Sequence, residues 1–68
     1  MRAQLEALVR EMVEKGIMYE DARREFERRY IIHALERGEG NIGRAAELIG
    51  LHRNTLTRKI AEYQIKRK

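Results

Sequence analysis

The sequence predicts an all-α fold with four helices in each chain. Apolar residues recur at intervals of three and four along most of the chain, the spacing that puts side chains on one face of a helix. Proline is absent, and four of the five glycines lie between these periodic stretches, where a helix must stop. The 68 residues have room for one small domain, so residues 1–68 are expected to form a single unit.

The first helix is predicted over residues 2–15, and Gly16 ends it. Its apolar side chains fall at positions i, i+3, i+4, i+7 and i+8, so they form one continuous stripe. The residues of this stripe are Leu5, Leu8, Val9, Met12 and Val13.

The second helix is predicted to begin at Tyr19 or Glu20 and to end at Arg37. Two acidic residues in its first turn suit the positive end of the helix dipole. Over residues 30–35 the helix is apolar almost all round, which indicates burial on two sides, by its own domain and by another chain. His33 lies in this segment and is predicted to be a core or interface histidine.

Residues 41–63 predict two short helices joined by a tight turn. Asn41 is a good cap for a helix over residues 42–49, and Gly50 follows it where a left-handed stop is needed. The last helix is predicted over residues 53–63, and the final three residues of the chain are predicted to be frayed.

Small residues let these two helices cross closely. Ala45 and Ala46 place no bulky side chain between them. Leu56 and Ile60 lie one turn apart and give the last helix a core stripe, with Tyr63 at its end. The segment therefore predicts a helix-turn-helix, in which the start of the second helix meets base edges in the major groove.

Charge is unevenly distributed along the chain. Residues 1–40 hold eight Lys and Arg against nine Asp and Glu, a net charge of −1. Residues 41–68 hold seven Lys and Arg against two Asp and Glu, a net charge of +5. A concentrated positive half predicts a nucleic-acid binder. The expected DNA contacts are Asn41, Arg44, His52, Arg53, Asn54, Thr55, Arg58 and Lys59.

The segment GNIGRAAELIGLHRNTLTRKIAEY resembles the DNA-binding module of the factor for inversion stimulation, Fis, and the Fis-type domains of NtrC-type enhancer-binding activators. The resemblance extends from about Phe26 to the end of the chain, and residues 1–20 match only in being helical and amphipathic. The shared frame consists of Ala34, Leu35, Gly40, Asn41, Ala45, Ala46, Leu48, Gly50, Arg53, Thr55, Leu56, Arg58 and Lys59.

The resemblance implies roles for individual residues. It implies that Arg53 reads a base edge or a nearby phosphate, and that Arg58 reaches into the groove. It implies that Asn41, Thr55 and Lys59 contact phosphates. Phosphate contacts fix the register of the protein on the duplex but do not read the base sequence.

Two positions depart from the family pattern. Gly43 stands where a hydroxyl or amide side chain is common, so one phosphate contact is expected to be missing. His52 stands where serine or asparagine often caps the recognition helix. Imidazole caps less well, so either the cap is weaker or His52 contacts DNA instead.

An intertwined homodimer is predicted, in which residues 1–37 are the dimerisation helices and residues 41–63 the helix-turn-helix. So short a chain buries a limited core, and a partner chain is the expected source of added stability. The resemblance implies that the two recognition helices bend DNA to reach successive major grooves. The expected dimerisation residues are Leu5, Leu8, Val9, Met12, Val13, Phe26, Tyr30 and Ile31.

Several other classes are disfavoured. There is no cysteine and only two distant histidines, so no metal site and no cofactor are expected. The sequence has no apolar run of about 18 residues, so no membrane span is predicted. No set of acid and base groups is expected to converge in a pocket, so no catalytic residue and no enzyme activity are predicted. The expected location is cytoplasmic and nucleoid-associated.

Two alternatives remain open. The chain could be the DNA-binding tail of a larger NtrC-type enhancer-binding activator, with a parent protein or the RNA polymerase machinery as a further partner. Less favoured is a helical adaptor for proteins, because an adaptor has no need of the outward-facing polar side chains at residues 53–59.

Overall fold

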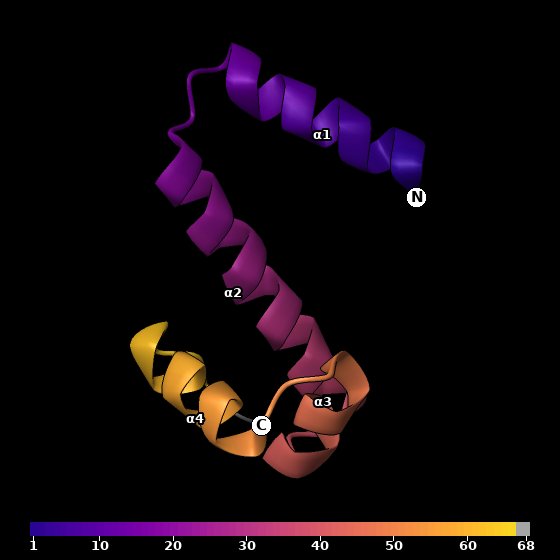
Figure 1. Cartoon of the computed structure of the whole chain (residues 1–68), viewed down its shortest axis with the longest axis vertical. Coiled ribbons are helices and arrows are strands. Elements are labelled where there is room, and N and C mark those ends of the chain that lie inside the picture. The colour runs from indigo at the N-terminus through magenta and orange to yellow at the C-terminus, as the bar shows by residue number, and fades with distance from the viewer. Residues whose placement is uncertain (67–68) are drawn as a thin grey trace.

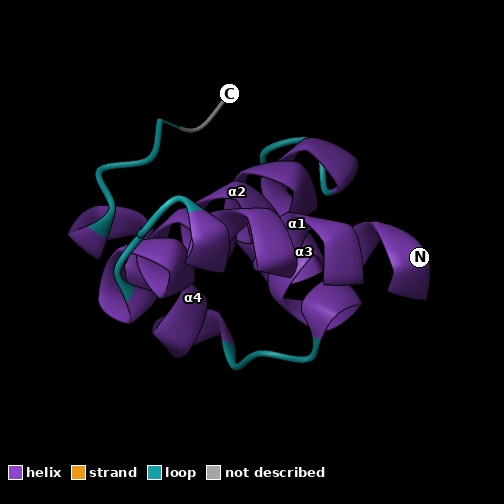
Figure 2. Ribbon diagram, turned by 90° about the horizontal axis from the view of Figure 1, so that it is seen from above, coloured by secondary structure: helices purple, strands orange, loops and turns teal. Residues whose placement is uncertain are grey.

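The computed structural model describes residues 1–66 as four α-helices joined by short loops (Figures 1 and 2). No strand occurs among these residues, so the predicted all-α class is confirmed. Predicted and observed helix boundaries agree within one residue. Fraying was predicted for the last three residues, and two of these, residues 67 and 68, lie outside the described residues. The helices are α1 (Arg2–Glu14), α2 (Tyr19–Arg37), α3 (Ile42–Ile49) and α4 (Arg53–Glu62).

Two glycines end helices in the way the sequence predicts. Gly16 follows α1 with a φ of 76°, and Gly50 caps α3 with a φ of 74°. A left-handed residue at this place turns the next backbone N–H groups onto the last carbonyls of the helix. The N–H of Ile17 accordingly donates to the carbonyl of Met12 at 3.0 Å, and that of Leu51 donates to the carbonyl of Ala46 at 3.0 Å.

The turn between α2 and α3 depends on a close approach at Gly38. A Cβ atom at this position would lie 3.0 Å from the backbone nitrogen of Ala45 and 3.1 Å from the carbonyl oxygen of Asn41. Both neighbours are backbone atoms, so neither can move aside without shifting α3. Glycine therefore sets how closely the end of α2 packs on α3.

The core lies where the C-terminal half of α2 meets α3 and α4. Ile31 and Leu56 are its most completely buried large side chains. Ile65 follows α4 and folds back onto this cluster, and its N–H donates to the carbonyl of Ile60 at 3.0 Å. The core consists of Ile31, Ala34, Leu35, Ala45, Ala46, Leu56, Ile60, Tyr63 and Ile65.

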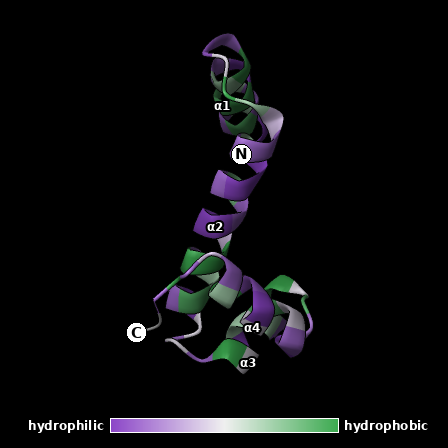
Figure 3. Cartoon of the chain, turned by 90° about the vertical axis from the view of Figure 1, so that its left-hand side faces the viewer, coloured by the Kyte–Doolittle hydropathy of each residue, from purple (hydrophilic) through white to green (hydrophobic). Residues whose placement is uncertain are grey.

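α1 lies apart from this core. It joins α2 at the end of α2 that is remote from α3 and α4 (Figure 1). It contains no buried residue, and Leu5, Leu8 and Val9 of its apolar stripe are about half exposed, at 48%, 52% and 49%. The hydrophilic middle of α2 separates apolar α1 from the apolar core (Figure 3). The stripe on α1 is thus formed as predicted but is left largely uncovered within one chain.

Two residues of α2 lie elsewhere than the sequence suggested. The core alternative for His33 is wrong, because its side chain is 77% exposed and lies 3.3 Å from Glu36, and the interface alternative stays a prediction. Ile31 is only 2% exposed and packs inside the chain's own core, whereas Phe26 and Tyr30 lie on the exposed face. The difference arises because α2 rotates Ile31, and not His33, towards α3 and α4.

None of the helices within residues 1–66 has the length and apolarity needed to cross a membrane.

Candidate nucleic-acid interface

The helix-turn-helix is built from α3, the turn at Gly50 and Leu51, and α4. Ala45 and Ala46 are buried on the side of α3 that meets Leu56 of α4, and their small size permits the close crossing. This crossing places the start of α4 beside α3 at the lower end of the molecule (Figure 1), and Arg53 and Asn54 there are exposed.

Both helices of the motif are capped by side chains. The Oδ1 atom of Asn41 accepts a hydrogen bond from the N–H of Arg44 at 3.0 Å, as the sequence predicts. This bond occupies the amide oxygen, and the –NH₂ group of Asn41, a donor, does not take part in it. A donor at the start of α3 suits a phosphate oxygen.

His52 caps α4 through its ring. Its Nδ1 atom accepts a hydrogen bond from the N–H of Asn54 at 3.0 Å. The accepting nitrogen carries no proton, so in the neutral ring the proton lies on Nε2. The side chain is exposed, so the Nε2–H group can still donate to an anion. The cap therefore does not exclude a DNA contact by the same ring.

The first two turns of α4 present a polar and basic surface. Arg53, Asn54 and Arg58 are exposed, and Thr55 is half-buried. Among residues 1–66, no carboxylate forms an ion pair with Arg53 or Arg58. Their guanidinium groups can therefore form bidentate hydrogen bonds with a base edge or a phosphate without first breaking an internal pair.

Lys59 is oriented differently from the other predicted contacts. Its Nζ atom lies 2.6 Å from Oε2 of Glu27 on α2, and the two side chains are only 24% and 22% exposed. The hydroxyl of Tyr63 donates to the same carboxylate, and Arg23 lies 3.1 Å from it. The hydrogen bonds from Lys59 and Tyr63 hold the pKa of the Glu27 carboxyl below its usual range. The bond to Glu27 raises the pKa of Tyr63.

Arg44 also forms an ion pair with a carboxylate, but this pair is more exposed than that of Lys59. Its guanidinium lies 2.8 Å from Glu39, with side-chain exposures of 63% and 79%. Exposed pairs of this type contribute little free energy and are screened by salt. Arg44 can therefore exchange Glu39 for a phosphate at small cost.

The sequence profile described as "Bacterial regulatory protein, Fis family" matches residues 22–63, well over half of the chain. The chain belongs to the Fis family of bacterial regulatory proteins. The resemblance inferred from the sequence is thereby confirmed. The matched segment contains all of α3 and α4 and most of α2, and it leaves α1 outside.

Two curated relatives show the same similarity. The chain is 42% identical over 45 residues to the nitrogen assimilation regulatory protein NtrX of Azorhizobium caulinodans, covering 66% of this chain and 10% of that protein. It is 44% identical over 46 residues to a putative Fis-like DNA-binding protein of Xylella fastidiosa, covering 68% of this chain and 51% of that protein. The chain thus matches about a tenth of one relative and half of the other. No solved structure matches it significantly.

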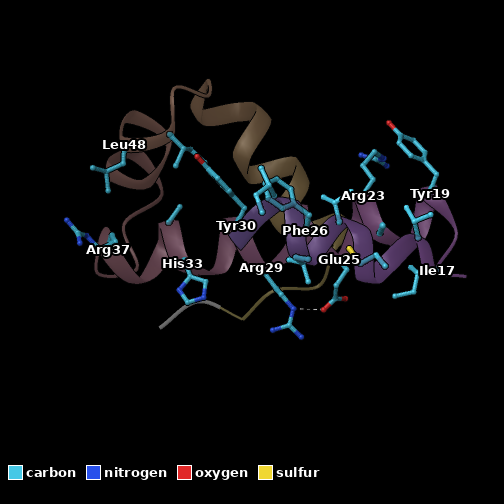
Figure 4. A pocket seen from close by; sticks show the side chains of 18 residues that line it. Ile17, Tyr19, Arg23, Glu25, Phe26, Arg29, Tyr30, His33, Arg37 and Leu48 are labelled. Atoms are coloured by element: carbon cyan, nitrogen blue, oxygen red, sulfur yellow. Dashed lines mark hydrogen bonds and ion pairs between the residues drawn. The ribbon is translucent and has the colours of Figure 1, made fainter. Parts of the chain in front are cut away.

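A second surface of this Fis-family chain is an apolar groove of about 1000 Å³ between α1 and α2, reaching the end of α3. Phe26 and Tyr30 lie side by side in it, with ring centroids 5.6 Å apart (Figure 4). Leu48 projects into its far end from α3. The residues predicted for dimerisation line this apolar groove, apart from Ile31: they are Leu5, Leu8, Val9, Met12, Val13, Phe26 and Tyr30.

Sequence reasoning missed the contribution of Glu27. It lies in a stretch of α2 in which most residues are charged. One signal was available, because Glu27 lies four residues before Ile31 and is therefore on the face of α2 that carries this core residue. No group of three or more potential metal ligands occurs within residues 1–66.

Proposed function

We propose that this chain binds double-stranded DNA as a homodimer, inserting one α4 from each chain into successive major grooves, and takes part in transcription regulation. The observation that carries the proposal is the exposed surface on the first two turns of the capped helix α4, where Arg53 and Arg58 have no carboxylate partner among residues 1–66. The relative from Xylella fastidiosa, whose printed name includes DNA binding, supports it.

The contacts divide by the chemistry of each side chain. Arg53 suits the O6 and N7 atoms of guanine, which accept a bidentate pair of hydrogen bonds. Asn54 and Arg58 lie close enough on the same helix to reach neighbouring bases or phosphates. The phosphate contacts, which set register, are assigned to Asn41, Arg44, His52 and Thr55. Lys59 is left out of this set because of its pair with Glu27.

A second copy of the chain is the proposed cover for the apolar groove. An isolated helix of α1's length is marginally stable in water, and within one chain α1 contains no fully buried residue. Large contiguous apolar patches on soluble proteins mark interaction sites. Pairing of α1 and α2 with their copies would bury the stripe and the two aromatic rings, and would fix two α4 helices relative to each other.

DNA bending is part of the proposal. Successive major grooves on one side of the duplex are about 34 Å apart. A dimer of small chains that holds its two α4 helices closer than this bends the duplex when both bind. The bending free energy, of a few kcal/mol, then depends on how flexible the base steps are. Binding to chromosomal DNA would place the protein with the nucleoid in the cytoplasm.

The match to NtrX favours a second form of the same function. The matched segment is 10% of that regulator, so this chain can also be considered as the DNA-binding part of a larger activator. Transcription activation would then depend on the rest of the parent protein acting on the RNA polymerase machinery.

Fluorescence anisotropy of a labelled duplex of about 25–30 base pairs tests the proposal. Titration at several salt concentrations should give a log-log slope of several units, with saturation at two chains per duplex. A scrambled unlabelled competitor separates site-specific binding from general binding. No binding at low salt would contradict the proposal and favour the protein adaptor instead.

A further inference from the structure

Glu27 gathers three donors from two helices. Its carboxylate lies 2.6 Å from Nζ of Lys59 and 3.1 Å from Arg23, and it accepts the hydroxyl of Tyr63. Lys59 lies in the last turn of α4 and Tyr63 is the C-cap residue that follows it, whereas Glu27 and Arg23 belong to α2. The carboxylate therefore ties the recognition helix to α2 and determines where the ammonium of Lys59 lies.

This pair differs from the other internal pair at the interface. Arg44 and Glu39 are 63% and 79% exposed, whereas Lys59 and Glu27 are 24% and 22% exposed. Partly buried pairs are screened much less by salt than exposed ones. Removing Lys59 from Glu27 would also leave a half-buried carboxylate with one donor fewer. Exchange with a phosphate is therefore far less favourable for Lys59 than for Arg44.

We propose that Glu27 is a specificity-determining residue that withholds Lys59 from the DNA backbone. The inference rests on the proposed DNA-binding function. Contacts to phosphate supply nearly all of the affinity for non-specific DNA and a smaller share of the affinity for a true site. By neutralising one lysine on the recognition helix, Glu27 lowers non-specific affinity more than specific affinity, and so raises the ratio between them.

The test is the variant Glu27→Gln in the full chain. Glutamine has the same shape and can still accept the hydroxyl of Tyr63, but it no longer neutralises Lys59. Anisotropy titrations with a preferred and a scrambled duplex should show a salt slope steeper by about one unit. Affinity for the scrambled duplex should rise several-fold at low salt, and the preference between the two duplexes should fall.

Two further variants serve as controls. Glu36→Gln makes the same change in net charge on α2, but Glu36 lies outside the apolar groove and pairs with His33 at 3.3 Å and not with α4. Its salt slope should equal that of the parent. The double variant Glu27→Gln with Lys59→Met removes the pair as a neutral unit, so its slope should also return to the parent value. Circular dichroism melting checks that each variant is folded.

Three outcomes would contradict the role of Glu27 or the DNA-binding function on which it rests. An unchanged slope in folded Glu27→Gln would contradict the role of Glu27 while leaving DNA binding intact. A double variant with a slope about one unit shallower than the parent would mean that Lys59 already contacts phosphate, and this test holds even if the single variant is unfolded. A parent chain that does not bind either duplex would overturn the proposed function and this inference together.

Discussion

Arg53 is the side chain on which sequence readout is expected to depend most. It stands at the first position of α4, exposed and without a carboxylate partner among residues 1–66. Replacement by alanine should cost about 1–3 kcal/mol in binding to a preferred duplex, because two hydrogen bonds to a base edge are lost. Anisotropy with single-base variants of that duplex should show relaxed preference at one base pair in each half-site.

Arg10 provides the control for Arg53. It lies exposed on α1, far along the chain from α4, and Arg10→Ala makes the same change of charge. Its effect on DNA binding should be small and equal for all duplexes. If Arg53→Ala discriminated between duplexes as the parent does, another residue would have to read the bases.

The bond between Glu27 and Tyr63 predicts a dependence of stability on pH. The folded pKa of Glu27 is lowered from 4.5, so its contribution is present above that value and is lost as pH falls through the folded pKa. The folded pKa of Tyr63 is raised from 10.0, so its contribution is present below 10.0 and is lost as pH rises through the folded pKa. The melting temperature should therefore fall at both acid and alkaline pH.

The measurement is the melting temperature by circular dichroism from about pH 3 to pH 11. Glu27→Gln should flatten the acid limb of the profile, since the group whose protonation weakens the fold is gone. Glu36→Gln is the control and should keep the acid limb of the parent, because the Glu36–His33 pair is exposed and lies outside the apolar groove. Identical acid limbs in all three proteins would show that Glu27 is not coupled to folding.

At the scale of the elements, the contact between α2 and α3 depends on Gly38. Gly38→Ala should lower the free energy of unfolding by about 1–3 kcal/mol, because the added methyl group meets backbone atoms of Asn41 and Ala45 at 3.1 and 3.0 Å. Urea unfolding followed by circular dichroism measures the change. Glu36→Ala, at an exposed position in the preceding turn, should have little effect, and equal losses in both variants would contradict the packing explanation.

The elements themselves could be predicted because their signals are local. Gly16, Gly50 and Asn41 each act within four residues of their own position, so the ends of α1 and α3 follow from the sequence. The pair between Glu27 and Lys59 could not be predicted in this way. It depends on how α2 and α4 are rotated and how they cross, and no short-range pattern specifies either.

The exposure of the predicted site residues follows from the sequence only in part, for the same reason. Arg53, Asn54 and Arg58 are exposed, as helical spacing requires once Leu56 is assigned to the core. The core alternative for His33 was wrong, because an apolar run in a helix does not reveal which of its residues faces the core. His33 lines the apolar groove, and the interface alternative stays a prediction. The opposite error applies to Ile31, which was expected at the surface between chains.

For the molecule as a whole, the apolar groove predicts the state of association. Leu8→Glu would put a charge into the apolar groove and should convert the proposed dimer into monomers, because burying an unpaired carboxylate is strongly unfavourable. Sedimentation equilibrium measures the mass, and circular dichroism should show a loss of helix from α1. DNA affinity should fall when the dimer is lost, since two linked α4 helices bind more tightly than one.

Gln4→Glu is the control for this prediction. Gln4 is exposed on α1 and does not line the apolar groove, so the same charge at that position should leave the mass unchanged. A monomeric parent chain at micromolar concentration would contradict the proposed dimer directly.

The uncovered apolar stripe on α1 has a consequence for how the amount of active protein depends on the concentration of chains in the cell. If only paired chains complete their fold and reach both grooves, the amount of active protein rises with the square of chain concentration while most chains are single. A twofold change in synthesis then becomes nearly a fourfold change in occupancy at unsaturated sites. In the proposed dimer, a helix with no buried residue in its own chain thereby makes DNA occupancy respond steeply to the supply of chains.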